Sequence, residues 1–153
     1  MEHIEYAYTH GMDDEEIAER LRAEGTGVLS LADEGDAYGI PLAHYYDGED
    51  LYFRLGMTED SHKDELLDAG GPVSYVVYGA DETDDPRGLD SWSIMVEGTL
   101  TRLPESDHDR FDTAAINRHF SPIRVFDEDI DEIEIVIYRL DADSVTGRKT
   151  SFD

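Results

Sequence analysis

The sequence predicts a mainly β (α+β) fold, a small antiparallel barrel of six strands with peripheral helices. Strand-like segments outnumber helix-like segments by about six to three, and the two kinds do not alternate along the chain. This order disfavours a doubly wound parallel sheet, which needs that alternation. The strand-like segments are joined by short, hairpin-like links, as in small antiparallel barrels. No repeat or linker divides residues 1–153, which we expect to form a single domain.

The first helix is expected over residues 12–24, MDDEEIAERLRAE. Asp13 and Glu16 have the spacing of a capping box, in which each side chain bonds the backbone N–H of the other residue. Ile17 and Leu21 repeat at the four-residue interval of a buried helix face. A glycine follows at the point where such a helix ends. These signals predict an amphipathic helix at the start of the domain.

Strand-like runs, bounded by turn-forming residues, recur along the rest of the chain. We expect strands over residues 26–32, 37–46, 49–55, 73–80, 91–103 and 132–140. Two further helices are expected over residues 61–69 and 105–120. The strands within 26–103 would form the core of the barrel, with the helices around it.

Asp47 and Gly48 are a residue pair that favours a tight, two-residue type I′ hairpin turn. If they form the whole loop, the predicted pairs are Tyr46 with Glu49, His44 with Leu51, Leu42 with Phe53, and Pro41 with Arg54. The side chains then divide between two faces. The core face carries Ile40, Leu42, His44, Leu51, Phe53 and Leu55, and the shallow face carries Pro41, Ala43, Tyr52 and Arg54.

Pro41 has no N–H to give to a neighbouring strand, so its strand is expected at an edge or a bulge. A flat ligand could lie on the shallow face there and bond to main-chain groups. The alternative is an ordinary solvated face that happens to carry Arg54.

The composition excludes several classes of protein. The formal net charge is −26, from 38 acidic and 12 basic residues, and no basic stripe could follow a nucleic acid backbone. There is no cysteine, so disulfides and thiolate chemistry are excluded. No segment reads as a membrane span or a signal peptide, which predicts a cytoplasmic protein. The acid excess is typical of a halophilic protein, and the acidic residues lack the spacing of a metal site.

Two of the twelve cations lie close together in the sequence. Arg54 and Lys63 lie nine residues apart, and Lys63 is one of only two lysines in the chain. Ser61 stands at the expected start of the 61–69 helix, where free N–H groups and the helix dipole favour an anion. A phosphate there would also account for Arg54, because guanidinium binds phosphate in a bidentate manner. Pairing of Lys63 with Asp60 or Asp64 is the alternative.

Three stretches carry a resemblance to a known family. They are TGVLSLADEGDAYGIPLAHYYDGEDLYF, SHKDEL and SWSIMVEGTL. In this order and spacing the chain resembles the pyridoxamine 5′-phosphate oxidase-like flavin-binding split-barrel family, and especially its short haloarchaeal members. The resemblance covers roughly residues 13–103, and the tail over 105–150 is similar to the same small subgroup. It implies a split antiparallel barrel that forms a homodimer with FMN at the subunit interface.

The resemblance also implies a set of FMN contacts. Ser61 and Lys63 match the family's Ser-x-Lys phosphate contacts, Arg54 would be a further contact, and the backbone at Pro41 would face the flavin ring. The full candidate set is Ile40, Pro41, Leu42, Phe53, Arg54, Leu55, Ser61, His62, Lys63, Trp92 and Ser93. The C-terminal SVTGRKTSFD lacks the Arg- and Trp-containing substrate segment of the true oxidases, which argues against vitamin B6 chemistry.

These features predict an FMN-dependent oxidoreductase whose substrate and electron donor are unknown. No residue stands out as a general acid or base, and His44, on the core face, is expected to be structural. A non-catalytic flavin-binding or redox-sensing module is an alternative that fits equally well. Binding of haem or a deazaflavin in place of FMN, or a purely structural salt-adapted domain, also remains open.

Overall fold

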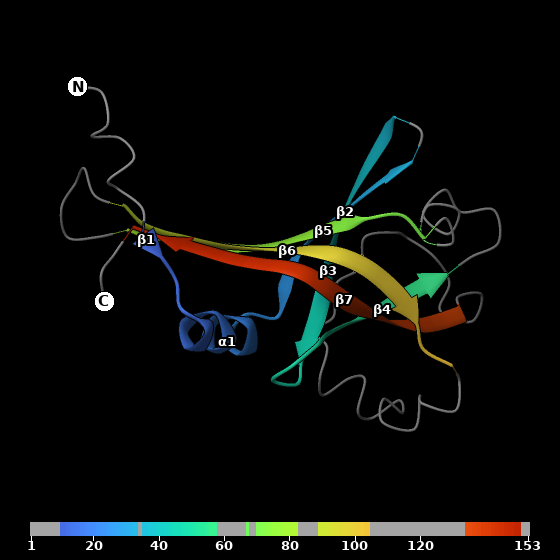
Figure 1. Ribbon diagram of the computed structural model, residues 1–153, viewed down its shortest axis with the longest axis horizontal. Helices are drawn as coiled ribbons and strands as arrows, with labels where there is room; N and C mark the ends of the chain where they lie inside the picture. Colours follow the sequence, from blue (N-terminus) through green and yellow to red (C-terminus); the bar gives the residue numbers. More distant parts are fainter. Residues whose placement is uncertain are drawn as a thin grey trace.

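Six antiparallel strands close into a barrel in the computed structural model, which describes residues 10–33, 35–57, 67, 70–82, 89–104 and 134–150 (Figure 1). The strand order is β1-β7-β4-β3-β2-β5-β6, and pairing of β6 with β7 closes the ring. This is the mainly β barrel that the sequence predicts. Its elements are β1 (His10–Gly11), α1 (Asp14–Ala23), β2 (Thr26–Asp33), β3 (Asp36–Tyr46), β4 (Leu51–Met57), β5 (Val73–Glu82), β6 (Leu89–Arg102) and β7 (Glu134–Lys149).

The first expected helix is α1, which lies against the barrel beside β6 and β7 (Figure 1). The Asp13 carboxylate accepts the Glu16 N–H at 2.8 Å, and Glu16 accepts the Asp13 N–H at 3.4 Å, so the capping box is present. Ile17 and Leu21 are buried against the strands. The helices expected over 61–69 and 105–120 lie outside the described residues, except for Leu67, which is helical and buried.

The register predicted for the β3–β4 hairpin is wrong by two residues. The observed pairs are His44 with Phe53, Tyr45 with Tyr52, and Tyr46 with Leu51, so residues 47–50 form a four-residue loop. The Asp47 carboxylate accounts for the longer loop, because it accepts the N–H groups of Glu49 at 2.9 Å and Asp50 at 2.8 Å. A shift of two residues keeps every side chain on its predicted face.

The last strand is longer than the sequence predicts. β7 runs to Lys149, whereas its apolar alternation ends at Leu140. The additional residues are held by pairing with β6, which extends from Arg102 to Trp92 and contains a bulge at Gly98. A Cβ at Gly98 would lie 2.1 Å from the Asp141 carbonyl oxygen, so only glycine fits opposite the bulge. Pairing with β6, and not the local sequence pattern, therefore determines the C-terminal half of β7.

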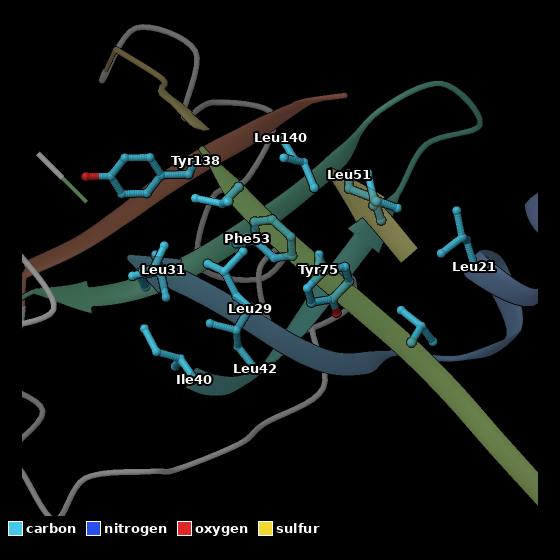
Figure 2. Close-up of a cluster of buried hydrophobic side chains, with 14 of the residues drawn as sticks. Leu21, Leu29, Leu31, Ile40, Leu42, Leu51, Phe53, Tyr75, Tyr138 and Leu140 are labelled. Carbon is cyan, nitrogen blue, oxygen red and sulfur yellow. The ribbon is translucent and has the colours of Figure 1, made fainter. Parts of the chain in front are cut away.

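The core fills the inside of the barrel with side chains from every main strand (Figure 2). Phe53 and Tyr75 meet edge to face at its centre, with ring centroids 4.7 Å apart. The largest fully buried side chains of this core are Tyr75, Phe53, Leu29, Ile94, Leu140, Val77, Val96 and Val136. The alternating strand positions point outward, away from this core.

Candidate functional site

The barrel is split between β3 and β4. Their pairing covers three residue pairs beside the hairpin loop, ending at His44 and Phe53. Beyond that point residues 36–43 of β3 pair with β2, whereas residues 54–57 of β4 pair with β7. Among the described residues, these two stretches have no ladder with each other. The edges of two strands therefore flank a gap whose main-chain groups the sheet does not use.

The direction of the β3 backbone shows which groups face this gap. The His44 N–H donates to the Gly25 carbonyl at 2.9 Å, on the β2 side. Because backbone groups alternate in direction along a strand, the N–H and C=O of Ala43 and the C=O of Pro41 point away from β2, toward β4. The sheet therefore needs no N–H donor at position 41, and a proline fits there without loss of a hydrogen bond of the sheet. The expectation of an edge at Pro41 agrees with this arrangement.

Arg54 lies on β4 at this split, paired with Ile137 of β7, and its side chain is half-buried. It projects from the outer face, next to a small apolar cluster outside the barrel core. That cluster consists of buried Ala43, Tyr52, Leu103 and Ile137, with half-buried Tyr45 packed against it. Burial lowers the pKa of the Arg54 guanidinium, which nevertheless stays protonated. A cation held against an apolar surface interacts strongly with an anion, since little water competes.

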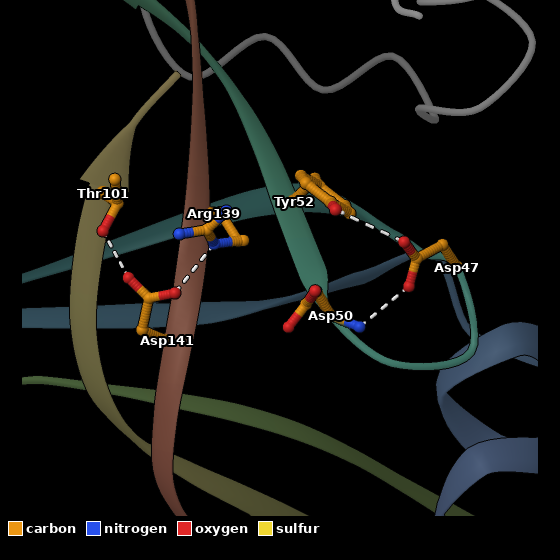
Figure 3. A network of polar contacts seen from close by, with 6 residues as sticks. All are labelled: Asp47, Asp50, Tyr52, Thr101, Arg139 and Asp141. Carbon is orange, nitrogen blue, oxygen red and sulfur yellow. Dashed lines mark hydrogen bonds and ion pairs between the residues drawn. The ribbon is translucent and has the colours of Figure 1, made fainter. Parts of the chain in front are cut away.

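A polar network borders the same outer face (Figure 3). Arg139 Nε donates to the Asp141 carboxylate at 2.7 Å, Thr101 donates to the same carboxylate, and the Tyr52 hydroxyl donates to Asp47 at 3.3 Å. Burial raises the pKa of Asp141, but the hydrogen bonds from Thr101 and Arg139 outweigh it, so the net pKa is lowered. This carboxylate stays charged and keeps Arg139 occupied.

The sequence reasoning missed this surface, although part of its signal is in the chain. Ile137 and Arg139 occupy alternate positions of the clean pattern at 132–140, and that alternation places them on the face opposite Tyr138. The stacking of Tyr45 on Tyr52, with centroids 6.2 Å apart, depends on the register of the hairpin. The position of Leu103 depends on its N–H bond to Ile137, which no local pattern contains.

The structure places the predicted site residues in three groups. Ile40, Leu42, Phe53 and Leu55 turn their side chains into the core, so only their backbone can contact a ligand at the split. Pro41 is exposed and Arg54 half-buried on the outer face. The third group, Ser61, His62 and Lys63, lies outside the described residues.

Trp92 and Ser93 differ from each other although they are neighbours on β6. Trp92 is 7% exposed and belongs to the core cluster, with the Arg20 guanidinium 4.7 Å from its ring centroid. Ser93 is exposed on the outer face, paired with Tyr78 of β5 and Arg148 of β7. Trp92 therefore packs as a core residue in this chain.

His44 is a structural residue, as its position on the core face predicts. It is 2% exposed, and both ring nitrogens have partners: Nδ1 lies 2.5 Å from the Tyr75 hydroxyl and Nε2 lies 2.9 Å from the Leu21 carbonyl. With Nε2–H donating to Leu21, Nδ1 accepts from Tyr75. Burial lowers the pKa of His44, although bonds to Leu21 and Glu24 oppose this. The histidine connects the end of α1 to the barrel.

Two kinds of site are absent from the described ranges. No group of three or more potential metal-ligating side chains occurs there. None of the helices described is both long and apolar enough to cross a membrane.

The sequence and the split barrel agree with one family of proteins. The model of the pyridoxamine 5′-phosphate oxidase family matches residues 13–149, which is most of the chain. The chain belongs to the pyridoxamine 5′-phosphate oxidase-like family. Its membership extends beyond the 13–103 segment on which the sequence resemblance rests, through the whole of β7. A search of the curated proteins found no match.

Solved structures show how widely this oxidase-like fold is shared. An FAD-binding protein from Mesorhizobium loti is 23% identical, with a TM-score of 0.66 over 94% of this chain and 99% of that one. An FAD-binding protein from Mycobacterium smegmatis is 16% identical, with a TM-score of 0.63 over 93% and 100%. An FAD- and haem-binding protein from the same organism is 18% identical, with a TM-score of 0.68 over 95% and 74%. At these identities the likeness concerns the fold alone.

Proposed function

We propose that this protein is an FMN-binding flavoprotein of the cytoplasm, an oxidoreductase whose substrate is unknown. The observation that carries the proposal is the split between β3 and β4, where main-chain groups of Pro41 and Ala43 that no ladder of the described strands uses lie on the edge opposite Arg54. A flavin needs hydrogen-bonding groups along its ring edge and cations at its phosphate, and this part of the molecule supplies both kinds.

Different residues would bind different parts of the flavin. Arg54, Ser61 and Lys63 would hold the phosphate, and the backbone of residues 40–43 would bond the ring edge. The bound flavin supplies the electron transfer, as cofactors do when the protein provides position and electrostatics. The half-buried Arg54 suits the phosphate, since its desolvation has already occurred in the folded protein. The family membership and the FAD-binding relatives support a flavin in this fold.

A homodimer with the cofactor at its interface follows from the same proposal. An apolar row crosses the outer face of the barrel, where Val28 pairs with Pro41 and Val76, and Val76 pairs with Met95. Met95 is 43% exposed and Tyr78, on the same face, is 67% exposed. Such outward-facing apolar residues suit a covered surface. A second copy of the chain is the partner that we propose.

Haem is the second cofactor to consider, because one solved relative is an FAD- and haem-binding protein. His44 does not suit an iron ligand here, since both of its nitrogens are already bonded in the core. A deazaflavin would use the same phosphate contacts as FMN. A non-catalytic flavin module would have the same site, and only turnover separates it from an enzyme.

The test is the visible spectrum of the protein purified in high salt and supplied with FMN, compared with Lys63→Ala. We expect a two-band flavin spectrum in the wild type and a weaker one in the variant, because loss of a charge-assisted phosphate contact costs about 1.5–3 kcal/mol. Lys149→Ala is a matched control, since the other lysine pairs with Glu16 of α1. A wild type that binds no FMN sinks the proposal, and oxidation of reduced nicotinamide with an added acceptor separates an enzyme from a passive module.

A further inference from the structure

One end of the barrel lies under α1. A pocket of about 180 Å³ opens there between the helix and strands β4, β6 and β7. Its walls are apolar and come from both sides, with Ile17 and Leu21 of α1 opposite Leu51 and Leu140. An engineered apolar cavity of about 150 Å³ is large enough for benzene. The space therefore accommodates a ligand body of six to eight carbon atoms.

The bulge in β7 creates this space. Leu140 and Ala142 point inward, and the extra residue at the bulge keeps Val145 on the same side, where it pairs with buried Val96. Val145 is nevertheless 44% exposed, and Ala142 is exposed as well. An exposed valine and an exposed alanine on the core side of one strand mark volume that the described part of the chain leaves unfilled.

The two charged residues that line the pocket are both acidic. Asp14 and Glu49 both line it and are both exposed, so they lie where it opens to solvent. Tyr46 also lines it, and its hydroxyl donates to the Gly48 carbonyl at 3.0 Å. None of the described residues that line it is cationic. The nearby Arg22 lies outside the lining, with its guanidinium 5.7 Å from the Tyr46 ring centroid.

The start of α1 does not make this an anion site. Its capping box already bonds the N–H groups of Asp13 and Glu16, and the first turn adds further carboxylates. An anion would meet the negative charges of Asp14 and Glu49 at the mouth. An apolar body with a positive head is the ligand that both parts of the pocket suit.

We propose that this pocket binds a small organic ammonium ion, with its hydrocarbon or aromatic body between Ile17 and Leu140 and its charge between Asp14 and Glu49. The site is separate from the proposed flavin site. The pocket is lined by Leu51 of β4, which points inward, whereas the proposed flavin site contains Arg54 of β4, which points outward. The proposal therefore stands whether or not the protein binds FMN.

The test compares three ligands of one size, benzylammonium, benzyl alcohol and benzoate, by nuclear magnetic resonance of the methyl groups of Ile17, Leu140 and Val145. We expect benzylammonium to bind most tightly and benzoate least. The variants Asp14→Asn and Glu49→Gln should each weaken benzylammonium binding about two- to fivefold, as for exposed ion pairs, with no change for benzyl alcohol. Glu19→Gln, on the exposed side of α1, is the matched control.

A second variant tests the pocket itself. Ala142→Phe places a ring in the empty volume, and we expect it to abolish binding of benzylammonium while the protein stays folded, because residue 142 is exposed. The Asp14 and Glu49 variants still test the proposal if this one fails to fold. Equal binding of the three ligands, or no binding at all by the wild type, would overturn the proposal.

Discussion

The two halves of β3 differ in how much of their bonding the protein uses. Residues 44–46 pair with β4, and His44 also bonds Gly25 beyond the other edge of the strand. Residues 36–43 pair with β2, and their other edge faces the split. In one half the side chain of His44 is buried with both nitrogens bonded, and in the other Pro41 is exposed. A single strand thus contains a half that pairs with β4 and a half whose edge toward β4 has no ladder among the described residues.

The difference shows why a rigid site can be built at an incomplete part of a sheet. The bonded half and the core beneath it fix the position of the free half, so its main-chain groups are oriented before a ligand arrives. Changes in the first half are expected to affect stability, and changes around the second to affect binding. Each of the following predictions tests that separation.

The largest effect is expected from His44→Ala. This change leaves the Tyr75 hydroxyl and the Leu21 carbonyl without their partner in the core, and each buried polar group so stranded costs about 1–3 kcal/mol. We expect the free energy of unfolding to fall by about 3 kcal/mol in a denaturant titration. His10→Ala, at a half-exposed position on β1, is the control. Flavin affinity of the remaining folded protein should not change.

The pH dependence of stability is a second test of His44. Burial lowers the pKa of His44, so the unfolded chain binds its proton more readily than the folded one does. Its contribution to stability is complete above the ordinary pKa of about 6.5 and is lost as the pH falls from there toward the folded pKa. His44→Ala should lack this part of the decline. An unchanged acid limb would mean that the core histidine is not neutral.

Arg54→Ala is the converse experiment. We expect FMN affinity to fall about tenfold or more, because a hydrogen bond to a charged group contributes about 1.5–3 kcal/mol. The free energy of unfolding should change by less than about 1 kcal/mol, since the guanidinium is half-buried on the outer face. Arg139→Ala is the control, because it removes another arginine from the outer face, one that is bonded to Asp141. A large loss of stability with unchanged affinity would make Arg54 a structural residue.

The smallest effect is expected from Asp141→Asn, on the polar network of the outer face. Hydrogen bonds from Thr101 and Arg139 lower the pKa of Asp141 despite the opposing effect of burial. Its contribution is therefore present above the ordinary pKa of about 4 and is lost below it as the pH falls. We expect a loss of about 0.5 kcal/mol at neutral pH, as for exposed ion pairs, and none in strong acid. Asp143→Asn, nearby and exposed, should have no effect.

The sequence predicts much of this fold because local signals coincide with the final structure. The capping box at Asp13, the alternation of β7 up to Leu140 and the two faces of the hairpin all appear as predicted. The two errors have different causes, one a pair of local hydrogen bonds in the turn and the other the pairing with a strand far away in the sequence. The Asp47 carboxylate lengthens the hairpin loop, and β6 extends β7 to Lys149.

The candidate site is predictable only in part, because it too depends on the turn at Asp47 and on pairing between strands. Pro41 and Arg54 stand out in the sequence, one for its missing N–H and the other as a rare cation. The register that sets them on opposite sides of the split depends on the loop at Asp47 and on pairing with β7. The Tyr45–Tyr52 stack and the bond of Arg139 to Asp141 join separate positions and have no local signature.

The most direct test of the two halves of β3 is a titration of the protein with FMN, followed by the backbone amide resonances. We predict large shifts at Leu42, Ala43 and Arg54, because they flank the split, and small shifts at Tyr45 and Tyr46. Addition of FMN to Arg54→Ala should produce the same pattern at higher concentration. Shifts concentrated at residues 44–46 and α1, with none at Ala43, would contradict a flavin site at the split.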